Sequence, residues 1–143
     1  MSQFVKVNCQ VLDDVNAAVF KKMIESMKLE GKKENNRYSL DINAKKVTGS
    51  YIRENDDTDV DCVLMENNKR LPIGFKFIKE GNKLKLNIRG DFWGTGFEEN
   101  SFKDLISKNY QIANIMLKNK NNGNTLVSRT VKEDGSVVLR YCA

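Results

Sequence analysis

Four carboxylates stand close together in the middle of the chain, at Asp56, Asp57, Asp59 and Asp61. On a strand, Asp57, Asp59 and Asp61 would share one face, and divalent cations favour such oxygen ligands. The spacing does not match a calcium-binding EF-hand loop, because the required glycine and the distal glutamate are missing. The sequence therefore favours a solvated acidic turn and edge strand over a metal site.

The chain has no histidine and three cysteines. The lack of histidine excludes Ser-His-Asp triads, zinc sites that depend on imidazole, and acid–base catalysis by imidazole. Cys9, Cys62 and Cys142 are far apart and form no Cys-x-x-Cys pair, so we expect neither a disulfide nor a zinc site. Cys9 and Cys62 lie in alternating apolar patterns and are expected in the core, whereas Cys142 is expected to be loosely held. We expect no catalytic residue and no cofactor.

A glycine-rich turn with three aromatic residues runs from Gly90 to Phe97. Glycines let backbone amides approach an anion, but the turn lacks the lysine and the Gly-Lys-Ser/Thr ending of a phosphate-binding loop. The simplest interpretation is a rigid connector in which Phe92, Trp93 and Phe97 pack beneath the next helix. Because tryptophan is enriched at binding hot spots, the same three residues are also candidate partner-binding residues. Tyr110, which interrupts the apolar stripe of that helix, is a fourth candidate, although such residues more often mark the edge of a buried face.

A basic face is predicted where charged and apolar residues alternate along two neighbouring strands. Lys76, Lys83, Lys85 and Arg89 should all point away from the core. Such a face suits a phosphate backbone or an acidic protein. The uncovered face of a one-sided sheet also needs charge for solubility, which explains these residues without a ligand. No RNA-recognition aromatic motif lies among them.

Two amphipathic helices are predicted from apolar residues spaced three and four apart. The first follows a cap at Asp13 or Asp14 and ends near Gly31. The second is capped by Asn100 or Ser101. Its apolar stripe comprises Phe102, Leu105, Ile106, Ile112, Ala113, Met116 and Leu117.

Alternating residues and turn signals predict strands in much of the remaining chain. The expected strands are Phe4–Leu12, Arg37–Ile42, Lys46–Arg53, Asp59–Met65, Ile73–Ile78, Lys83–Arg89, Thr125–Val131 and Ser136–Tyr141. We therefore expect a single α+β domain over residues 1–143. Its two helices should pack on one face of a single antiparallel sheet of about six to eight strands.

The composition excludes few functions. The 143 residues carry a formal net charge of +5 and are 30% charged, as in an ordinary soluble domain. No apolar run approaches the ~20 residues that span a bilayer, and the first residues do not resemble a secretory signal. We therefore expect a cytoplasmic location and no membrane partner. The mild positive charge is compatible with nucleic acid or an acidic partner but requires neither.

The start and the last third of the chain carry several short motifs that are typical of a known family. These are Ser2-Gln3-Phe4-Val5-Lys6-Val7, Asp91-Phe92-Trp93-Gly94, Phe102-Lys103-Asp104-Leu105, Lys108-Asn109-Tyr110 and Asp134-Gly135-Ser136-Val137-Val138-Leu139-Arg140-Tyr141. With them the chain resembles the uncharacterised conserved open-reading-frame family of chloroplasts and bacteria, the ycf thirty-five type or domain of unknown function twelve fifty-seven. The resemblance implies a small accessory protein, often encoded near an ATPase of the AAA+ type. It implies no catalytic residue set.

These observations lead to a ranked set of functions. The leading hypothesis is a non-enzymatic accessory or adaptor protein that acts through protein–protein contacts, with an AAA+ type ATPase as candidate partner. The alternative is a nucleic-acid-binding module that uses the predicted basic face. An enzyme that uses carboxylates and a divalent ion ranks third. The oligomeric state does not follow from the sequence.

Overall fold

The computed structural model describes residues 4–8, 14–27, 35–49, 52–53, 55–134 and 136–143. The elements follow the order β1 (Phe4–Asn8), α1 (Ala17–Ser26), β2 (Tyr38–Asp41), the 3₁₀ turn η1 (Asp56–Thr58), β3 (Cys62–Glu66), β4 (Lys69–Glu80), β5 (Lys83–Asp91), α2 (Glu99–Asn121), β6 (Thr125–Val131) and β7 (Val137–Cys142). Among the described residues, no helix is long and apolar enough to cross a membrane.

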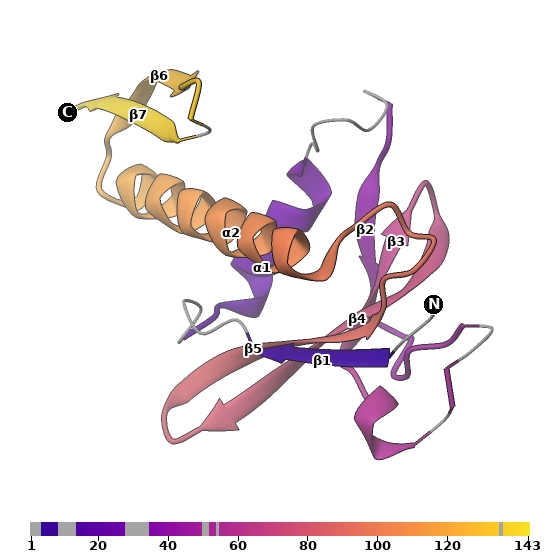
Figure 1. Ribbon diagram of the computed structural model, residues 1–143. Coiled ribbons are helices and arrows are strands. Elements are labelled where there is room, and N and C mark those ends of the chain that lie inside the picture. The colour runs from indigo at the N-terminus through magenta and orange to yellow at the C-terminus, as the bar shows by residue number, and fades with distance from the viewer. Residues whose placement is uncertain (1–3, 9–13, 28–34, 50–51, 54, 135) are drawn as a thin grey trace.

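The main sheet has five antiparallel strands in the order β1-β5-β4-β3-β2, and β6 and β7 form a separate two-stranded sheet. The α+β class is confirmed, but the prediction of one sheet of six to eight strands is wrong. In the described part of the expected strand Lys46–Arg53, only Lys46 pairs, through an isolated bridge to Asp59. In addition, α2 extends over 23 residues and carries the final hairpin away from the main sheet (Figure 1).

Local turn chemistry explains why the central strands pair in sequence order. Asn67 and Asn68, between β3 and β4, have positive φ angles of 53° and 65°, as a two-residue hairpin turn requires. Gly81, with φ 62°, turns the chain between β4 and β5. At the other end of this hairpin, Gly90 allows a close approach of backbones, since a Cβ atom there would lie 2.2 Å from the carbonyl oxygen of Pro72.

The first helix begins later than predicted. Asn16 caps α1, and its side-chain oxygen accepts hydrogen bonds from two amides of the first turn at 3.0 and 3.2 Å. Asp14 is not the cap, because its carboxylate instead accepts a hydrogen bond from the amide of Leu84 at 3.3 Å. The helix ends at Ser26. The other predicted cap, Asp13, and the predicted stop, Gly31, lie outside the described residues.

The second helix begins earlier than predicted. Its N-cap is Glu98, so the two predicted caps, Asn100 and Ser101, lie inside the first turn. The Ser101 hydroxyl donates a hydrogen bond to the Glu98 carboxylate at 2.6 Å. This bond ties the N-cap residue to the first turn of the helix. The predicted helix itself and its apolar stripe are confirmed.

Both helices pack on the same face of the main sheet. Phe20 of α1 meets Phe75 and Phe77 of β4 edge to face, with ring centroids 4.9 and 5.6 Å apart. Phe102 of α2 stacks on the same Phe75 ring, with ring centroids 6.3 Å apart. Cys62 lies in the same core, as predicted. Cys142 is exposed, and Cys9 lies outside the described residues.

The opposite face of the sheet is partly covered, contrary to the expectation of an open face. Val47 and Val60, from the segment between β2 and β3, pack with Val63 in a second apolar cluster. Gly74 of β4 lies beneath them, since a Cβ atom there would come within 2.9 Å of both Val60 and Val47. The segment that was expected to form a strand therefore forms a lid over this face instead.

Candidate functional site

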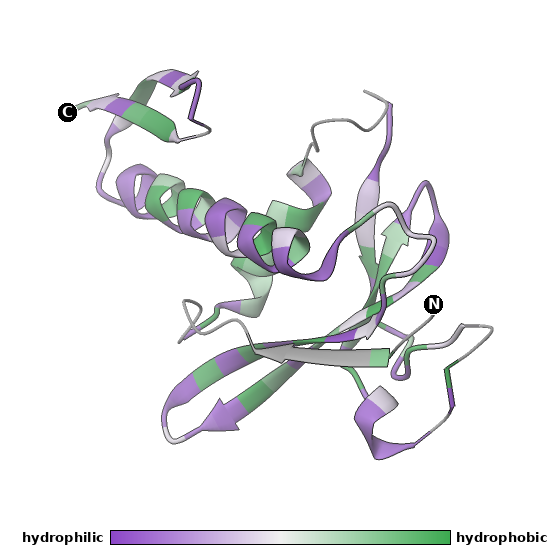
Figure 2. Cartoon of the chain, in the orientation of Figure 1, coloured by the Kyte–Doolittle hydropathy of each residue, from purple (hydrophilic) through white to green (hydrophobic). Residues whose placement is uncertain are grey.

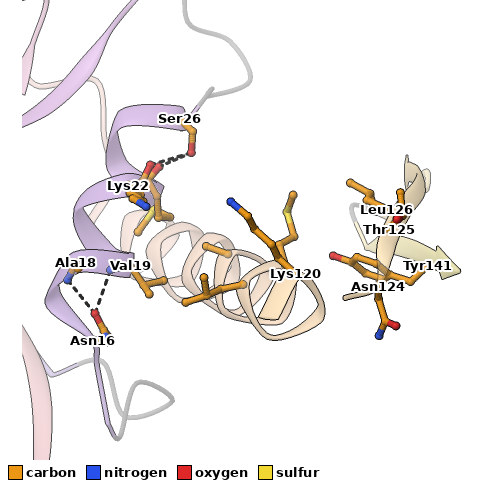
Figure 3. A pocket seen from close by; sticks show the side chains of 14 residues that line it. Asn16, Ala18, Val19, Lys22, Ser26, Lys120, Asn124, Thr125, Leu126 and Tyr141 are labelled. Atoms are coloured by element: carbon orange, nitrogen blue, oxygen red, sulfur yellow. Dashed lines mark hydrogen bonds between the residues drawn. The ribbon is translucent and has the colours of Figure 1, made fainter. Parts of the chain in front are cut away.

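A groove of about 690 Å³ lies between α1, the last turns of α2 and the β6–β7 hairpin (Figure 3). We call it the interhelical groove. Its volume falls within the ~300–1,000 Å³ typical of ligand sites. Its aliphatic and methionine lining residues are Ala18, Val19, Met23, Ala113, Met116, Leu117 and Leu126.

The groove exists because the apolar stripe of α2 continues beyond its fully buried part, and the core covers Ala113 and Leu117 only partly. Phe102, Ile106 and Tyr110, in the first half of the helix, are buried. From residue 112 onward no residue of the helix is buried, and Ile115 is 47% exposed. At 1.5 Å per residue, a helix of this length extends roughly 35 Å, which is longer than α1 can cover. Figure 2 shows green apolar patches along this outer part of α2.

The hairpin forms the far side of the groove. Leu126 of β6 pairs with Tyr141 of β7, and both side chains line the groove. An isolated two-stranded sheet is marginally stable in water, so the hairpin depends on its contact with α2. Val127 is 60% exposed and Val131 57%, and the hairpin therefore also presents apolar surface away from α2.

One polar atom in this region lacks a partner. The Tyr141 hydroxyl is the buried side-chain polar atom that makes no hydrogen bond within the described part of the chain. It points from the hairpin toward the last turns of α2 (Figure 3). Leaving a buried hydroxyl unpaired costs about 1–3 kcal/mol.

The charges at the groove all have the same sign. The charged residues that line it are Lys22 on α1 and Lys120 in the last turn of α2. No carboxylate lines the groove, and no salt bridge to either lysine is found among the described residues. The groove is therefore an apolar channel with positive charge contributed by both helices.

The glycine–aromatic turn is mainly a structural connector. Phe92 is buried against Phe102 with ring centroids 5.4 Å apart, and Phe97 lies 4.9 Å from the same ring. Thr95 fixes the turn, because its hydroxyl donates to the Phe92 carbonyl at 2.6 Å. Trp93 alone of the three predicted aromatic anchors is open to solvent, at 62% exposure. Phe92 is too buried for the predicted contact role, and Phe97 is half-buried in the same packing.

Tyr110 is also a structural residue and not a surface anchor. Its side chain is buried, and its hydroxyl accepts a hydrogen bond from the backbone amide of Asn16 at 2.8 Å. The polar interruption in the apolar stripe thus marks the point where α2 meets the start of α1.

The predicted basic face is not a free cationic surface. Arg89 is buried beneath the segment between β2 and β3, and its guanidinium donates to the Asp59 carbonyl at 2.7 Å and to the side-chain oxygen of Asn87 at 2.7 Å. Lys85 pairs with Glu80 at 3.0 Å. The other two lysines of the predicted basic face are not free either. The Lys76 amine lies 3.8 Å from an Asp61 carboxylate oxygen, and Lys83 also interacts with another group of the chain.

The four aspartates of the acidic cluster have separate structural roles. Asp59 pairs with Lys46 at 2.9 Å, and this hydrogen bond lowers the pKa of the Asp59 carboxyl. Asp61 accepts a hydrogen bond from the Phe77 amide at 2.7 Å. Asp56 and Asp57 form the η1 turn. Among the described residues, no group of three or more Cys, Asp or Glu side chains is placed to hold a metal ion.

The sequence placed Ala113, Met116 and Leu117 in the apolar stripe of the second helix, and two of them, Ala113 and Leu117, do pack partly against the core. It did not single out Lys22 or Lys120. The available signal was the length of the apolar stripe, which exceeds what a ten-residue α1 can cover. The position of Tyr141 beside the stripe depends on where the hairpin folds back. No local pattern contains that information.

Comparison with known proteins gives a family but no function. A family model described as a protein of unknown function (DUF1257) matches residues 25–139. No curated protein and no solved structure matches the chain. The matched region includes β2 to β6, all of α2 and the first half of β7, so the family resemblance is confirmed, although the motif at residues 2–7 lies outside the match. The chain belongs to the DUF1257 family.

Proposed function

We propose that this chain is a non-enzymatic accessory protein that holds a protein partner in the interhelical groove. The observation that carries the proposal is the outer half of α2, whose apolar stripe continues past the last fully buried residue and stays partly exposed, although Ala113 and Leu117 also touch the core. Apolar surface that is lined up along a helix and left half-covered is typical of a protein-interaction site.

The lining of the groove suits this role. Met23 and Met116 are flexible side chains that adapt to the shape of a partner. The groove draws on α1, α2 and the hairpin, so a partner would contact all three at once. An ATPase of the AAA+ type, which the family resemblance implies, is the first partner to test.

We do not extend the proposal to nucleic acid. Arg89 is buried, and Lys76 and Lys85 already lie near carboxylates of the chain. A nucleic-acid site would need these cations to be available to phosphates.

The test compares two neighbouring residues of α2. Met116 lines the groove, whereas Ile115 is exposed on the same helix but does not line it. Affinity purification of tagged chain from its native cells identifies bound proteins, and each candidate is then purified and titrated against the chain by calorimetry. We expect Met116→Asp to weaken the partner at least about 30-fold, the level of a hot-spot residue, and Ile115→Asp to retain it.

Folding is checked by circular dichroism. If Met116→Asp unfolds the chain, Leu126→Asp on the opposite side of the groove takes its place. A partner that binds Met116→Asp, Leu126→Asp and the unaltered chain equally well would refute the proposal.

A further inference from the structure

We infer that the occupant of the interhelical groove is an acidic amphipathic helix, whose apolar face fills the groove and whose carboxylates meet Lys22 and Lys120. This inference rests on the proposed function and names the chemistry of the partner.

The shape of the groove favours a helix. Val19 and Met23 stand four residues apart on α1, and Ala113, Met116 and Leu117 follow the same three- and four-residue spacing on α2. Two helices that present such rows form ridges and grooves that a third helix can complement. A helix with apolar residues at the same spacing would therefore continue the packing that α1 and α2 have begun.

The charge of the groove indicates which charged residues should border the apolar face of the bound helix. Lys22 and Lys120 come from the two helices that border the channel, and no carboxylate from the described part of the chain lines it. An acidic helix would place opposite charge beside both amines, whereas a basic helix would meet repulsion from both. Electrostatic complementarity of this kind selects the partner more strongly than it raises affinity.

The test uses synthetic peptides. The acidic probe is a helical peptide of about 18 residues, five turns at about 3.6 residues per turn, with leucine on one face and glutamate at its borders. A second peptide has lysine in place of every glutamate, and a third has the acidic composition with the leucine spacing scrambled. Binding to the full chain is measured by fluorescence anisotropy. We expect the acidic peptide to bind about tenfold more tightly than either control, a difference that corresponds to ~1.4 kcal/mol.

A matched pair of double variants locates the charge effect. Lys22→Glu with Lys120→Glu should weaken the acidic peptide about tenfold and strengthen the basic one. Lys21→Glu with Lys118→Glu makes the same change of net charge on exposed residues of the same helices that do not line the groove, and should leave both affinities within about twofold.

The possible outcomes separate the two proposals. If Met116→Asp abolishes binding of the cellular partner but both double variants behave alike, the acidic helix is refuted and the protein-binding groove stands. If no peptide binds, or if acidic and basic peptides bind equally, the inference is wrong. Binding to vesicles that contain phosphatidylglycerol through Lys22 and Lys120, without binding of the peptide, would assign the groove to an anionic lipid instead.

Discussion

The hydroxyl of Tyr110, in the middle of α2, accepts a hydrogen bond at 2.8 Å from the backbone amide of Asn16, the residue that caps α1. One side chain thus joins the two helices at the point where the first one starts. Asn16 also lines the interhelical groove, so this bond fixes one end of the groove. Beyond Tyr110 the helix has no buried residue, and the groove opens there.

The variant Tyr110→Phe should lower the free energy of unfolding by about 0.5–1.5 kcal/mol, because it removes the hydrogen bond to the partly buried Asn16 amide. Urea unfolding followed by circular dichroism measures the change. The matched control is Tyr141→Phe, which also removes one hydroxyl, but one that makes no hydrogen bond within the described residues. We expect that control to be neutral or slightly stabilising. Equal losses in the two variants would contradict the assigned roles.

The aromatic turn offers a second contrast between neighbours. Phe92 is buried against Phe102, so Phe92→Ala should cost about 3–5 kcal/mol, the range for a large aromatic side chain in a core. Trp93→Ala should change stability by less than about 0.5 kcal/mol, because the indole is largely exposed. Thermal unfolding of both variants provides the measurement. A destabilised Trp93→Ala protein would show that the indole packs against the chain in solution.

The parts of the fold that followed from the sequence are those that local signals determine. Asn67 and Gly81 mark hairpin turns through their own backbone preference, and alternation predicts the strands on either side. The cap of α1 was misplaced because Asp14 is an equally good cap by composition. Its carboxylate instead meets the Leu84 amide, 70 residues away along the chain. Strand number failed for a similar reason, since Val47 and Ile52 belong to the expected strand Lys46–Arg53 but pack over the sheet instead.

The candidate site was harder to predict than the fold. Arg89 looked like a surface cation because it alternates with buried residues, and only the fold of the segment around Asp59 buries it. The groove depends on the relative lengths of two helices and on the position of the final hairpin. Neither quantity is encoded in a short motif. The family resemblance, in contrast, depended on local residue strings and was confirmed.

Stability should decline at high pH through two groups that hold their protons more tightly in the folded chain. Burial, followed by the hydrogen bond to Glu66 at 2.6 Å, raises the pKa of Tyr38 from 10.0 to about 12. Burial, with the nearby Asp61 charge, raises the pKa of Cys62 from 9.0 to about 12. Because the folded pKa exceeds the unfolded one, each contribution is complete below the unfolded value and is lost as pH rises through the folded value.

Urea unfolding at pH 8 and at intervals up to about pH 12 tests this pH dependence. We expect the free energy of unfolding to fall from about pH 9 upward in the unaltered chain. Cys62→Ala combined with Tyr38→Phe should be less stable at pH 8 but should decline less steeply. Parallel curves for the two proteins would show that other groups cause the alkaline loss.

Arg89 gives the sharpest test between a structural and a nucleic-acid role for the predicted basic face. Its guanidinium bridges β5 and the segment between β2 and β3, with bonds to Asn87 and to the Asp59 carbonyl. Arg89→Lys keeps the charge but loses this forked geometry, so we expect a loss of about 1.5–3 kcal/mol and faster hydrogen exchange at the Val47 and Val60 amides. Lys85→Gln, at an exposed ion pair, should cost less than about 1 kcal/mol. An Arg89→Lys protein of unchanged stability that had lost salt-dependent DNA binding in a gel shift would place the guanidinium on a phosphate-binding surface instead.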